Sequence, residues 1–189
     1  MKGFYKGLAA FAIVAAAATS TAQAQVGFNV GGGLSMPLGD FGDQADMGFH
    51  GLVGVTFQPA SLPVGVRVDG MYHMWGGSED AFGDLDVGTR AIVGTANAVY
   101  TFQTAETSTF HPYLIGGLGL YNTALTGDDV PDGFDDSSTD FGINAGAGFN
   151  FSAGESLGLF VEGRFHNVFT EGESTSFIPI SVGVRLGGS

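Results

Sequence analysis

Apolar and polar residues alternate along most of this chain, and this alternation is the strongest constraint on its fold. It recurs in eight segments, each roughly ten residues long. A period of two places successive side chains on opposite faces of a β-strand, whereas a helix repeats every 3.6 residues. The sequence therefore predicts an all-β fold. The segments are Val26–Ser35, Phe49–Gln58, Val64–Trp75, Arg90–Phe102, His111–Thr123, Phe141–Phe151, Leu157–Thr170 and Phe177–Leu186.

The connections between these segments alternate between short and long. The short ones are Pro59–Pro63, Gln103–Phe110 and Ser152–Ser156, and the long, polar ones are Met36–Gly48, Gly76–Thr89 and Ala124–Asp140. Only Glu171–Ser176, between the last two segments, departs from the contrast. Membrane barrels combine short periplasmic turns with longer outer loops, and their strands span the bilayer with about 9–11 residues. The pattern predicts an eight-stranded antiparallel up-and-down transmembrane β-barrel.

A soluble lipocalin-like binding barrel has the same alternation with its faces reversed, and it is the less favoured alternative. The polar face here consists mostly of Gly, Asn, Ser and Thr, and no lysine occurs after residue 6. Such small, neutral residues suit a narrow lumen better than a water-facing surface. Aromatic residues near the segment ends are expected to form an interfacial girdle: Tyr72, Tyr100, Tyr113, Tyr121, Phe151 and Phe169.

The first 24 residues have the form of a cleaved signal peptide. Lys2 and Lys6 precede an apolar run over Leu8–Ala18, and Ala22–Ala24 has the small-x-small form of a cleavage site. We expect cleavage before Gln25, which leaves residues 25–189 as the barrel domain. The mature chain then holds four arginines and all 19 acids, a charge of −15. That charge excludes nucleic-acid binding, because it repels phosphate backbones.

Three stretches of the chain resemble a known group of proteins. They are Gly31–Phe41, Pro112–Tyr121 and Leu157–Phe165. These stretches are similar to the small bacterial outer-membrane β-barrel-domain proteins, the group around OmpX-type and opacity-type barrels, and the likeness runs over residues 25–189. The resemblance implies residence in the outer membrane of a Gram-negative-type bacterium, contact with outer-membrane lipid and lipopolysaccharide, and a structural or surface role with a surface ligand as candidate partner.

The sequence predicts no enzymatic activity. Catalysis by a nucleophile requires a base within hydrogen-bond reach of it. Outer-membrane lipid A deacylases resemble this chain in being small barrels, and they carry a His-x-Ser pair on one strand. The nearest match here, over Arg164–Val168, lacks the serine.

Charged residues on the predicted inward face are candidates for ion pairs in the lumen. They are Arg67, Asp69, Glu162, Arg164 and Arg185. If the turn over Glu171–Ser176 is symmetric, Glu162 lies opposite Arg185 on the neighbouring strand, and the two should pair. The alternative is a charged filter in a small channel for minor solutes. Eight strands enclose a space that side chains fill, so paired charges are favoured over a pore.

Acidic residues gather in the predicted outer loops, which hold fifteen of the 19 acids. The sequence from Asp128 partly matches a calcium-binding loop. It has Gly133 at the sixth place, but Val130 stands at the third, where such a loop has a ligand. The candidate ligands for weakly bound Ca²⁺ or Mg²⁺ are Asp128, Asp132, Asp135 and Asp136; no other cofactor is expected. Arg90, facing lipid at the outer end, is a candidate contact for a lipid phosphate. The sequence therefore favours a structural or surface-interaction role through acidic loops, with a small channel as the alternative.

Overall fold

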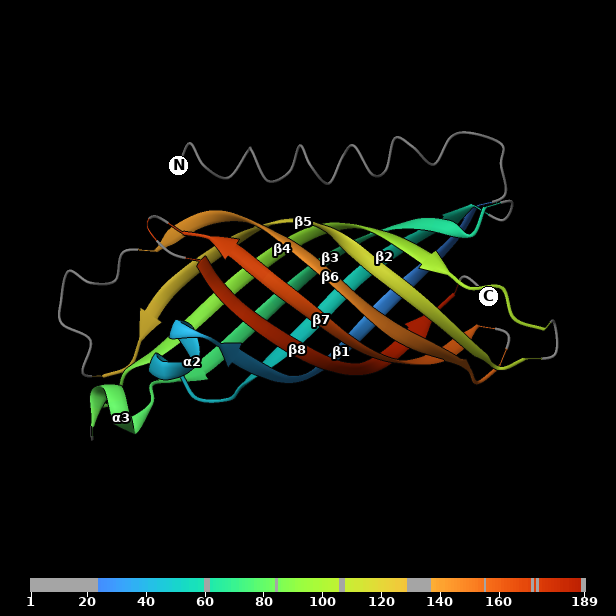
Figure 1. Ribbon diagram of the computed structural model, residues 1–189. Coiled ribbons are helices and arrows are strands. Elements are labelled where there is room, and N and C mark those ends of the chain that lie inside the picture. Colours follow the sequence, from blue (N-terminus) through green and yellow to red (C-terminus); the bar gives the residue numbers. More distant parts are fainter. Residues whose placement is uncertain are drawn as a thin grey trace, which may run out of the picture.

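The computed structural model describes residues 24–59, 62–83, 85–105, 108–128, 137–154, 156–170, 172 and 174–187. Eight antiparallel strands form a closed barrel in which each strand pairs with its neighbour in sequence and β8 returns to β1 (Figure 1). The predicted all-β, up-and-down barrel is confirmed. The strands are β1 (Ala24–Leu38), β2 (Gly48–Pro59), β3 (Val64–Gly76), β4 (Gly88–Thr101), β5 (Phe110–Thr126), β6 (Ser138–Ser152), β7 (Leu157–Phe169) and β8 (Ser174–Leu186).

Residues 1–23 lie outside the described residues, so the signal peptide and its cleavage site stay a prediction. Within the described part of the chain, no helix is long and apolar enough to cross a membrane.

The strands are staggered around the barrel, and the stagger can be followed through the pairing. The partners of Phe28 on β1 lead strand by strand around the barrel and return to β1 at Leu38, ten residues further along. A stagger of this kind requires the strands to tilt by about 35–45° from the barrel axis. The intermediate partners are Val55, Val68, Ala96, Leu118, Ile143, Asn167 and Ser176.

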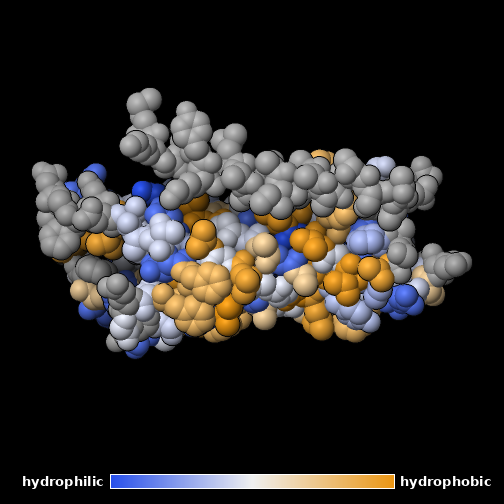
Figure 2. Space-filling model, turned by 90° about the horizontal axis from the view of Figure 1, so that it is seen from above, coloured by the Kyte–Doolittle hydropathy of each residue, from blue (hydrophilic) through white to orange (hydrophobic). Residues whose placement is uncertain are grey.

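Apolar side chains cover the outside of the barrel wall. Phe49, Val53 and Leu120 are 69%, 60% and 59% exposed, and every strand carries large exposed apolar residues. Figure 2 shows hydrophobic side chains over the part of the barrel wall that is in view. Polar side chains on the other face of the strands, such as Asn29, Thr56 and Glu162, point inward and are buried. A soluble barrel has the reverse arrangement, so the outward face fits a wall in contact with lipid.

Inward-facing glycines make room for large side chains inside the lumen. A Cβ on Gly148 would lie 2.5 Å from the ring of Tyr113, and one on Gly142 would lie 2.7 Å from the ring of Tyr121. Real Cβ atoms do not approach other atoms so closely, because protein interiors are already close-packed. Glycine at these two positions therefore has a steric cause: a narrow lumen accommodates a large ring only where the facing residue has no side chain.

Two short helices lie at the outer end of the barrel, at the left of Figure 1. α2 (Asp40–Gln44) follows a turn at Gly39, whose φ of 58° favours glycine. α3 (Glu79–Phe82) begins after Ser78, whose hydroxyl accepts a hydrogen bond from the Ala81 N–H. Both segments were expected as irregular loops. Their helices are one turn long, too short to leave a periodic signal in the sequence.

The predicted register between the last two strands is wrong. β8 begins at Ser174, so Phe169 pairs with Ser174 and Glu162 lies opposite Ser181 rather than Arg185. The cause is a turn tighter than the one assumed: polar residues after 173 already belong to the strand, where they show no apolar alternation. Asn167 Nδ2 donates to Ser176 Oγ at 2.8 Å and fixes this early pairing.

Candidate functional site

The middle of the lumen is crossed by four charged side chains, here called the charge quartet: Arg67, Asp69, Glu162 and Arg164. Arg67 Nη2 donates to both carboxylate oxygens of Glu162 at 2.8 Å each, and Arg164 Nε donates to Glu162 Oε1 at 2.6 Å. Asp69 lies 3.0 Å from Arg67 Nε and 2.9 Å from Arg164 Nη2. Each arginine therefore contacts both acids, and all four side chains are at most 4% exposed.

The charge quartet joins opposite sides of the barrel. Arg67 and Asp69 lie on β3, Glu162 and Arg164 lie on β7, and these strands are four apart in either direction around the closed sheet. Both strands run from the turn end toward the outer end, so Arg67 faces Glu162 and Asp69 faces Arg164 across the lumen. The four formal charges cancel. The four ion-paired side chains, which carry no net charge together, thus block the lumen at mid-height.

Further polar groups complete the hydrogen bonding of the two acids. Tyr113 donates its hydroxyl to Glu162 Oε2 at 2.8 Å, and Asn97 Nδ2 donates to Asp69 Oδ2 at 3.0 Å. Asn144 in turn donates to Asn97 Oδ1 at 2.9 Å. Buried charges are tolerated when they are paired and hydrogen-bonded in this way. The quartet is therefore part of a larger polar network that involves β3, β4, β5, β6 and β7.

The predicted aromatic girdle is wrong at two positions, Tyr113 and Tyr121. Both were expected at the membrane interface, but they are 2% and 0% exposed and point into the lumen. Tyr121 shares a hydrogen bond of 2.8 Å with His166 Nδ1. The sequence around them, over Pro112–Tyr121, has apolar residues at both parities, so periodicity did not reveal which face is inward. Tyr72, Tyr100, Phe151 and Phe169 are exposed, as expected of the girdle.

Toward the outer end, three buried histidines form the next layer of the lumen. His50 lies opposite His73 with the two rings stacked at 5.1 Å, and the centroid of His166 is 6.5 Å from that of His73. His50 Nε2 and His73 Nδ1 share hydrogen bonds of 2.7 and 2.8 Å with Ser181 and Ser35. Among the described residues, no group of three or more metal-ligating side chains is placed to hold a metal ion.

Aromatic rings close the lumen above the histidines. Trp75 stacks on His73 at 5.1 Å, and Phe177 stacks on His166 at 4.9 Å. Phe41, on α2, packs edge-on against Trp75 at 5.2 Å, so the outer helix covers this layer. Trp75 Nε1 donates to the Ser35 carbonyl at 3.1 Å. The outer half of the lumen is filled by side chains from the wall and from α2.

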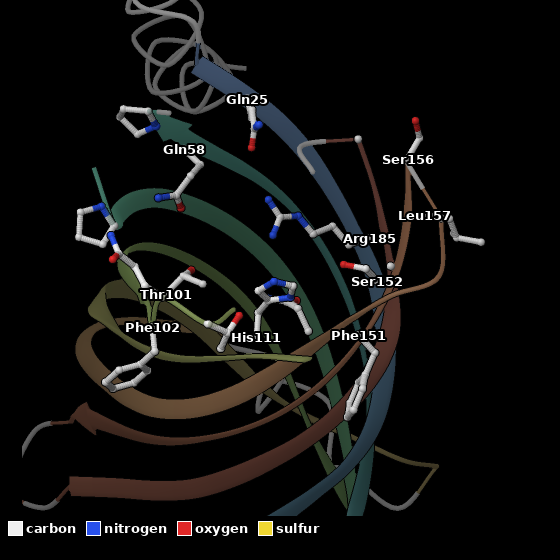
Figure 3. A pocket seen from close by; sticks show the side chains of 18 of the residues that line it. Gln25, Gln58, Thr101, Phe102, His111, Phe151, Ser152, Ser156, Leu157 and Arg185 are labelled. Atoms are coloured by element: carbon white, nitrogen blue, oxygen red, sulfur yellow. The ribbon is translucent and has the colours of Figure 1, made fainter. Parts of the chain in front are cut away.

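The periplasmic end of the barrel is hollow instead. A cavity of about 550 Å³ opens between the short turns, and it is lined by residues from several strands and turns (Figure 3). Arg185 belongs to this cavity and is separate from the charge quartet. Its backbone pairs with Gly158 and Asn29, and its Nε is buried without a hydrogen-bond partner among the described residues.

The acidic outer rim is exposed at the opposite end. Asp128 lies at its edge, whereas Asp132, Asp135 and Asp136 lie outside the described residues, so the cation site stays a prediction. Arg90 is partly exposed on the outward face, beside Met74 of β3. The described acids of this rim are Asp40, Asp43, Asp46, Glu79, Asp80, Asp86, Asp128 and Asp140.

The structure brings four of the five predicted lumen charges together and leaves Arg185 apart. Sequence reasoning missed the hydroxyl of Tyr113, the amide of Asn97 and the ring of His166. A signal for the quartet was present: an Arg-x-Asp pattern on β3 and a Glu-x-Arg pattern on β7, in complementary order on strands four apart. The cross-strand rule considers only neighbouring strands, so it paired Glu162 with the wrong arginine.

Comparison with known proteins decides the family. The profile of the family described as "Outer membrane protein beta-barrel domain" matches residues 7–186 of the chain. The chain belongs to this barrel family. It is an outer-membrane β-barrel protein, and the predicted residence in the outer membrane is confirmed. No curated protein matches this member of the family.

Solved structures share the fold of this outer-membrane barrel at low sequence identity. Neisserial surface protein A is 18% identical with a TM-score of 0.60, covering 86% of this chain and 96% of its own. A major outer membrane protein from Thermus thermophilus is 13% identical with a TM-score of 0.60, covering 87% and 99%. Ail of Yersinia pestis, in complex with the heparin analogue sucrose octasulfate, is 12% identical with a TM-score of 0.55, covering 86% and 99%. At these identities the likeness shows the fold alone.

Proposed function

We propose that this outer-membrane barrel is a non-catalytic surface protein that binds its partners through the acidic outer rim. The observation that carries the proposal is the uneven distribution of charge along the barrel. Eight described acids lie at the outer end, where Arg90 is the one arginine or lysine among the described residues. Such a surface attracts cations and cationic groups and repels polyanions. The heparin analogue bound to Ail is itself a polyanion, so the partners of this rim differ in charge from that ligand.

Divalent cations are the simplest partners for the rim. Neighbouring carboxylates repel one another, and a hard cation relieves the repulsion while taking oxygen ligands. In the outer membrane such a cation would bridge the rim to anionic lipopolysaccharide, with Arg90 adding a direct contact to a lipid phosphate. A loop sequence with apolar Val130 at the third place supports only weak binding, at about 10⁻⁴–10⁻³ M.

Calcium titration with limited proteolysis tests the cation proposal. Millimolar calcium should protect the segment between Ala124 and Asp140 from cleavage, and changing Asp132, Asp135 and Asp136 to Asn should abolish the protection. As a matched control, changing Asp40 and Asp43 to Asn removes acids from α2 and should leave the protection of the loop intact. Equal protection in the triple variant, or none in the unaltered protein, would show that the loop is a solvated acidic surface without a cation site.

A small channel for minor solutes is the alternative function, and side-chain packing in the lumen argues against it. The charge quartet spans from β3 to β7, and Trp75 and Phe177 fill the space above it. Recordings from planar bilayers test this point. The unaltered barrel should give no discrete conductance steps, whereas reproducible single-channel steps would replace the surface role by a channel.

A catalytic role has little support in the lumen. Ser35 and Ser181 each hydrogen-bond to a histidine, which is the pairing of a nucleophile with a base. Ser35 is 0% exposed and Ser181 is 2% exposed, beneath rings that exclude a substrate. We interpret both pairs as hydrogen bonds that satisfy buried imidazoles. Lipid A hydrolysis assays with the refolded protein should therefore show no release of acyl chains above background.

A further inference from the structure

Arg185 differs from the other inward arginines in having no described acid beside it. Arg67 and Arg164 each contact two carboxylates, whereas Arg185 makes no ion pair with any described residue. Its Nε is buried and has no hydrogen-bond partner in the described part of the chain. An arginine that is partly removed from water and unpaired loses solvation without a compensating charge. The site is energetically incomplete unless an anion joins it.

The cavity around Arg185 has the chemistry of a site for a polar ligand. Figure 3 shows its guanidinium and the side chain of His111 directed into the cavity, while Leu157 points away. Gln58 lies at the edge of the cavity, where its Nε2 donates to the Leu62 carbonyl at 2.8 Å. Among the described residues of the lining, Arg185 is the one Arg, Lys, Asp or Glu, and the volume of about 550 Å³ falls within the range of small-molecule sites, roughly 300–1,000 Å³. Other hydrogen-bonding side chains in the lining are Gln25, Thr101, Asn150, Ser152 and Ser156.

We infer that this periplasmic cavity binds a small organic molecule that carries one carboxylate and several hydrogen-bonding groups. The guanidinium of Arg185 forms the anchor, because its planar fork of donors matches the two oxygens of a carboxylate. Amides and hydroxyls in the wall then bind the polar remainder of the molecule. The inference concerns the end of the barrel away from the acidic rim, so it stands independently of the proposed surface function.

The charge of the cavity selects a carboxylate over a phosphate. One arginine neutralises one negative charge, whereas a phosphate near pH 7 carries between one and two. The second charge would be left without a partner in a partly desolvated site. No described acid provides the anion, since the described residues of the lining include no Asp or Glu.

Access to the cavity is from the periplasm alone, because the charge quartet and the aromatic layer fill the lumen above it. A ligand that enters therefore returns by the same route. The cavity is a binding site and not the entrance of a transport path.

Side-chain NMR of the arginines gives a direct test in the folded, detergent-solubilised protein. The chain contains only four arginines, so each Nε–H signal can be assigned by substitution. The probe is N-acetylalanine, with the neutral N-acetylalaninamide as its uncharged counterpart and inorganic phosphate as the competing anion. N-acetylalanine should shift the Arg185 signal saturably, while the signals of Arg67, Arg90 and Arg164 stay in place.

Substitutions connect the response to this residue. Binding of N-acetylalanine, followed by calorimetry, should weaken about tenfold or more in Arg185→Gln, since hydrogen bonds to charged groups contribute about 1.5–3 kcal/mol. Arg90→Gln is the matched control, an arginine of the outward face, and should leave binding unchanged. The NMR comparison of acid and amide uses the unaltered protein, so the test survives if a variant fails to fold.

Several results would overturn the inference. They are an Arg185 signal that does not move, an equal response to the neutral amide, and binding that persists in Arg185→Gln. Stronger binding of inorganic phosphate than of N-acetylalanine would contradict the choice of carboxylate. Glu155 precedes the lining residue Ser156 in sequence and lies outside the described residues. If N-acetylalanine binds only after Glu155→Gln, the anion of the cavity is a side chain of this protein, and the inference is wrong.

Discussion

Inward-facing arginines have different surroundings in the middle of the lumen and at its periplasmic end. At mid-height, Arg67 and Arg164 are buried and each contacts both Asp69 and Glu162. At the periplasmic end, Arg185 lies on the same inward face of the wall but borders an open cavity whose described lining residues include no acid. In the first region the arginines hold the barrel together, and in the second the arginine is available to a ligand.

The comparison shows that facing inward and being paired are separate properties. Alternation along a strand determines whether a side chain enters the lumen, because successive residues point to opposite faces. Whether it finds a partner depends on its height along the barrel axis and on what lies across the lumen. The four predictions below test this distinction, and their expected effects decrease in order.

Removing the negative charge of Glu162 should have the largest effect. Glu162→Gln breaks the ion pairs to Arg67 and Arg164 and leaves two arginines sharing one acid. Breaking a buried ion pair costs about 3–5 kcal/mol, so the free energy of unfolding, measured by urea titration in lipid vesicles, should fall by that amount. Combining Glu162→Gln with Arg67→Gln should cost clearly less than the sum of the single changes.

The same cycle with Arg185 provides the control. Glu162→Gln and Arg185→Gln should be additive within about 0.5 kcal/mol, because the two side chains do not share a partner. Strong coupling between the two substitutions would show that Glu162 and Arg185 interact, although the register places Glu162 opposite Ser181.

A methyl group added at Gly148 should disturb the same network sterically. The new Cβ would lie 2.5 Å from the ring and hydroxyl of Tyr113 and 2.7 Å from the Val161 carbonyl, and would displace the tyrosine from Glu162. Overpacking of this kind costs about 1–3 kcal/mol, and we expect the upper part of that range for Gly148→Ala. At Gly163 a Cβ meets nothing within 4 Å, so Gly163→Ala is the matched control. Equal unfolding midpoints for both variants would show that the Tyr113 ring can move away from a Cβ at position 148 without loss of stability.

Deleting the hydroxyl of Tyr113 should have a smaller effect. Tyr113→Phe removes one donor to Glu162 and keeps the ring that fills the lumen, and Glu162 retains its bonds to Arg67 and Arg164. The loss should be about 1.5 kcal/mol, the lower end for a hydrogen bond to a charged group. Tyr100→Phe, on the lipid-facing side, should change the unfolding free energy by much less. A null result for Tyr113→Phe would remove Tyr113 from the network.

Neutralising Arg185 in the absence of ligand should have the smallest effect on stability. Arg185→Gln breaks no ion pair with a described residue and removes a partly desolvated charge, so the unfolding free energy should not fall, and any rise should stay within about 0.5 kcal/mol. A loss comparable to that of Glu162→Gln would mean that Arg185 has a structural partner. The two regions would then not differ in the way described.

Sequence alone was sufficient for the architecture, because alternation is a local property that each strand displays independently. β6 illustrates this: Phe141, Ile143 and Phe149 face outward while Asn144 and Gly148 face inward, as predicted. The inward position of all five lumen charges follows from the same rule. The inward and outward faces of a strand can therefore be predicted from one sequence wherever the strand has one apolar and one polar face.

The pairing within the lumen was not readable, and two cases show why. The β7–β8 register depends on where polar residues near Ser174 enter the strand, and alternation carries no signal there. In β5, Tyr113 and Tyr121 are amphipathic side chains that suit a membrane interface and a polar lumen equally. Their inward position is decided by the space at Gly148 and Gly142 on the neighbouring strand, which is a property of the assembled barrel.

The arrangement of the quartet also bears on how the chain enters a membrane. Arg67 and Asp69 lie two residues apart on β3, and Glu162 and Arg164 lie two residues apart on β7. Each of these strands therefore brings one cation and one anion in mutual contact, with no net charge at mid-height. Transferring an unpaired charge into an apolar medium is costly, so hairpins that are neutral before the barrel closes can insert one after another. Arg185, near the periplasmic rim, has no such companion among the described residues, and insertion from the periplasm does not carry it across the apolar layer.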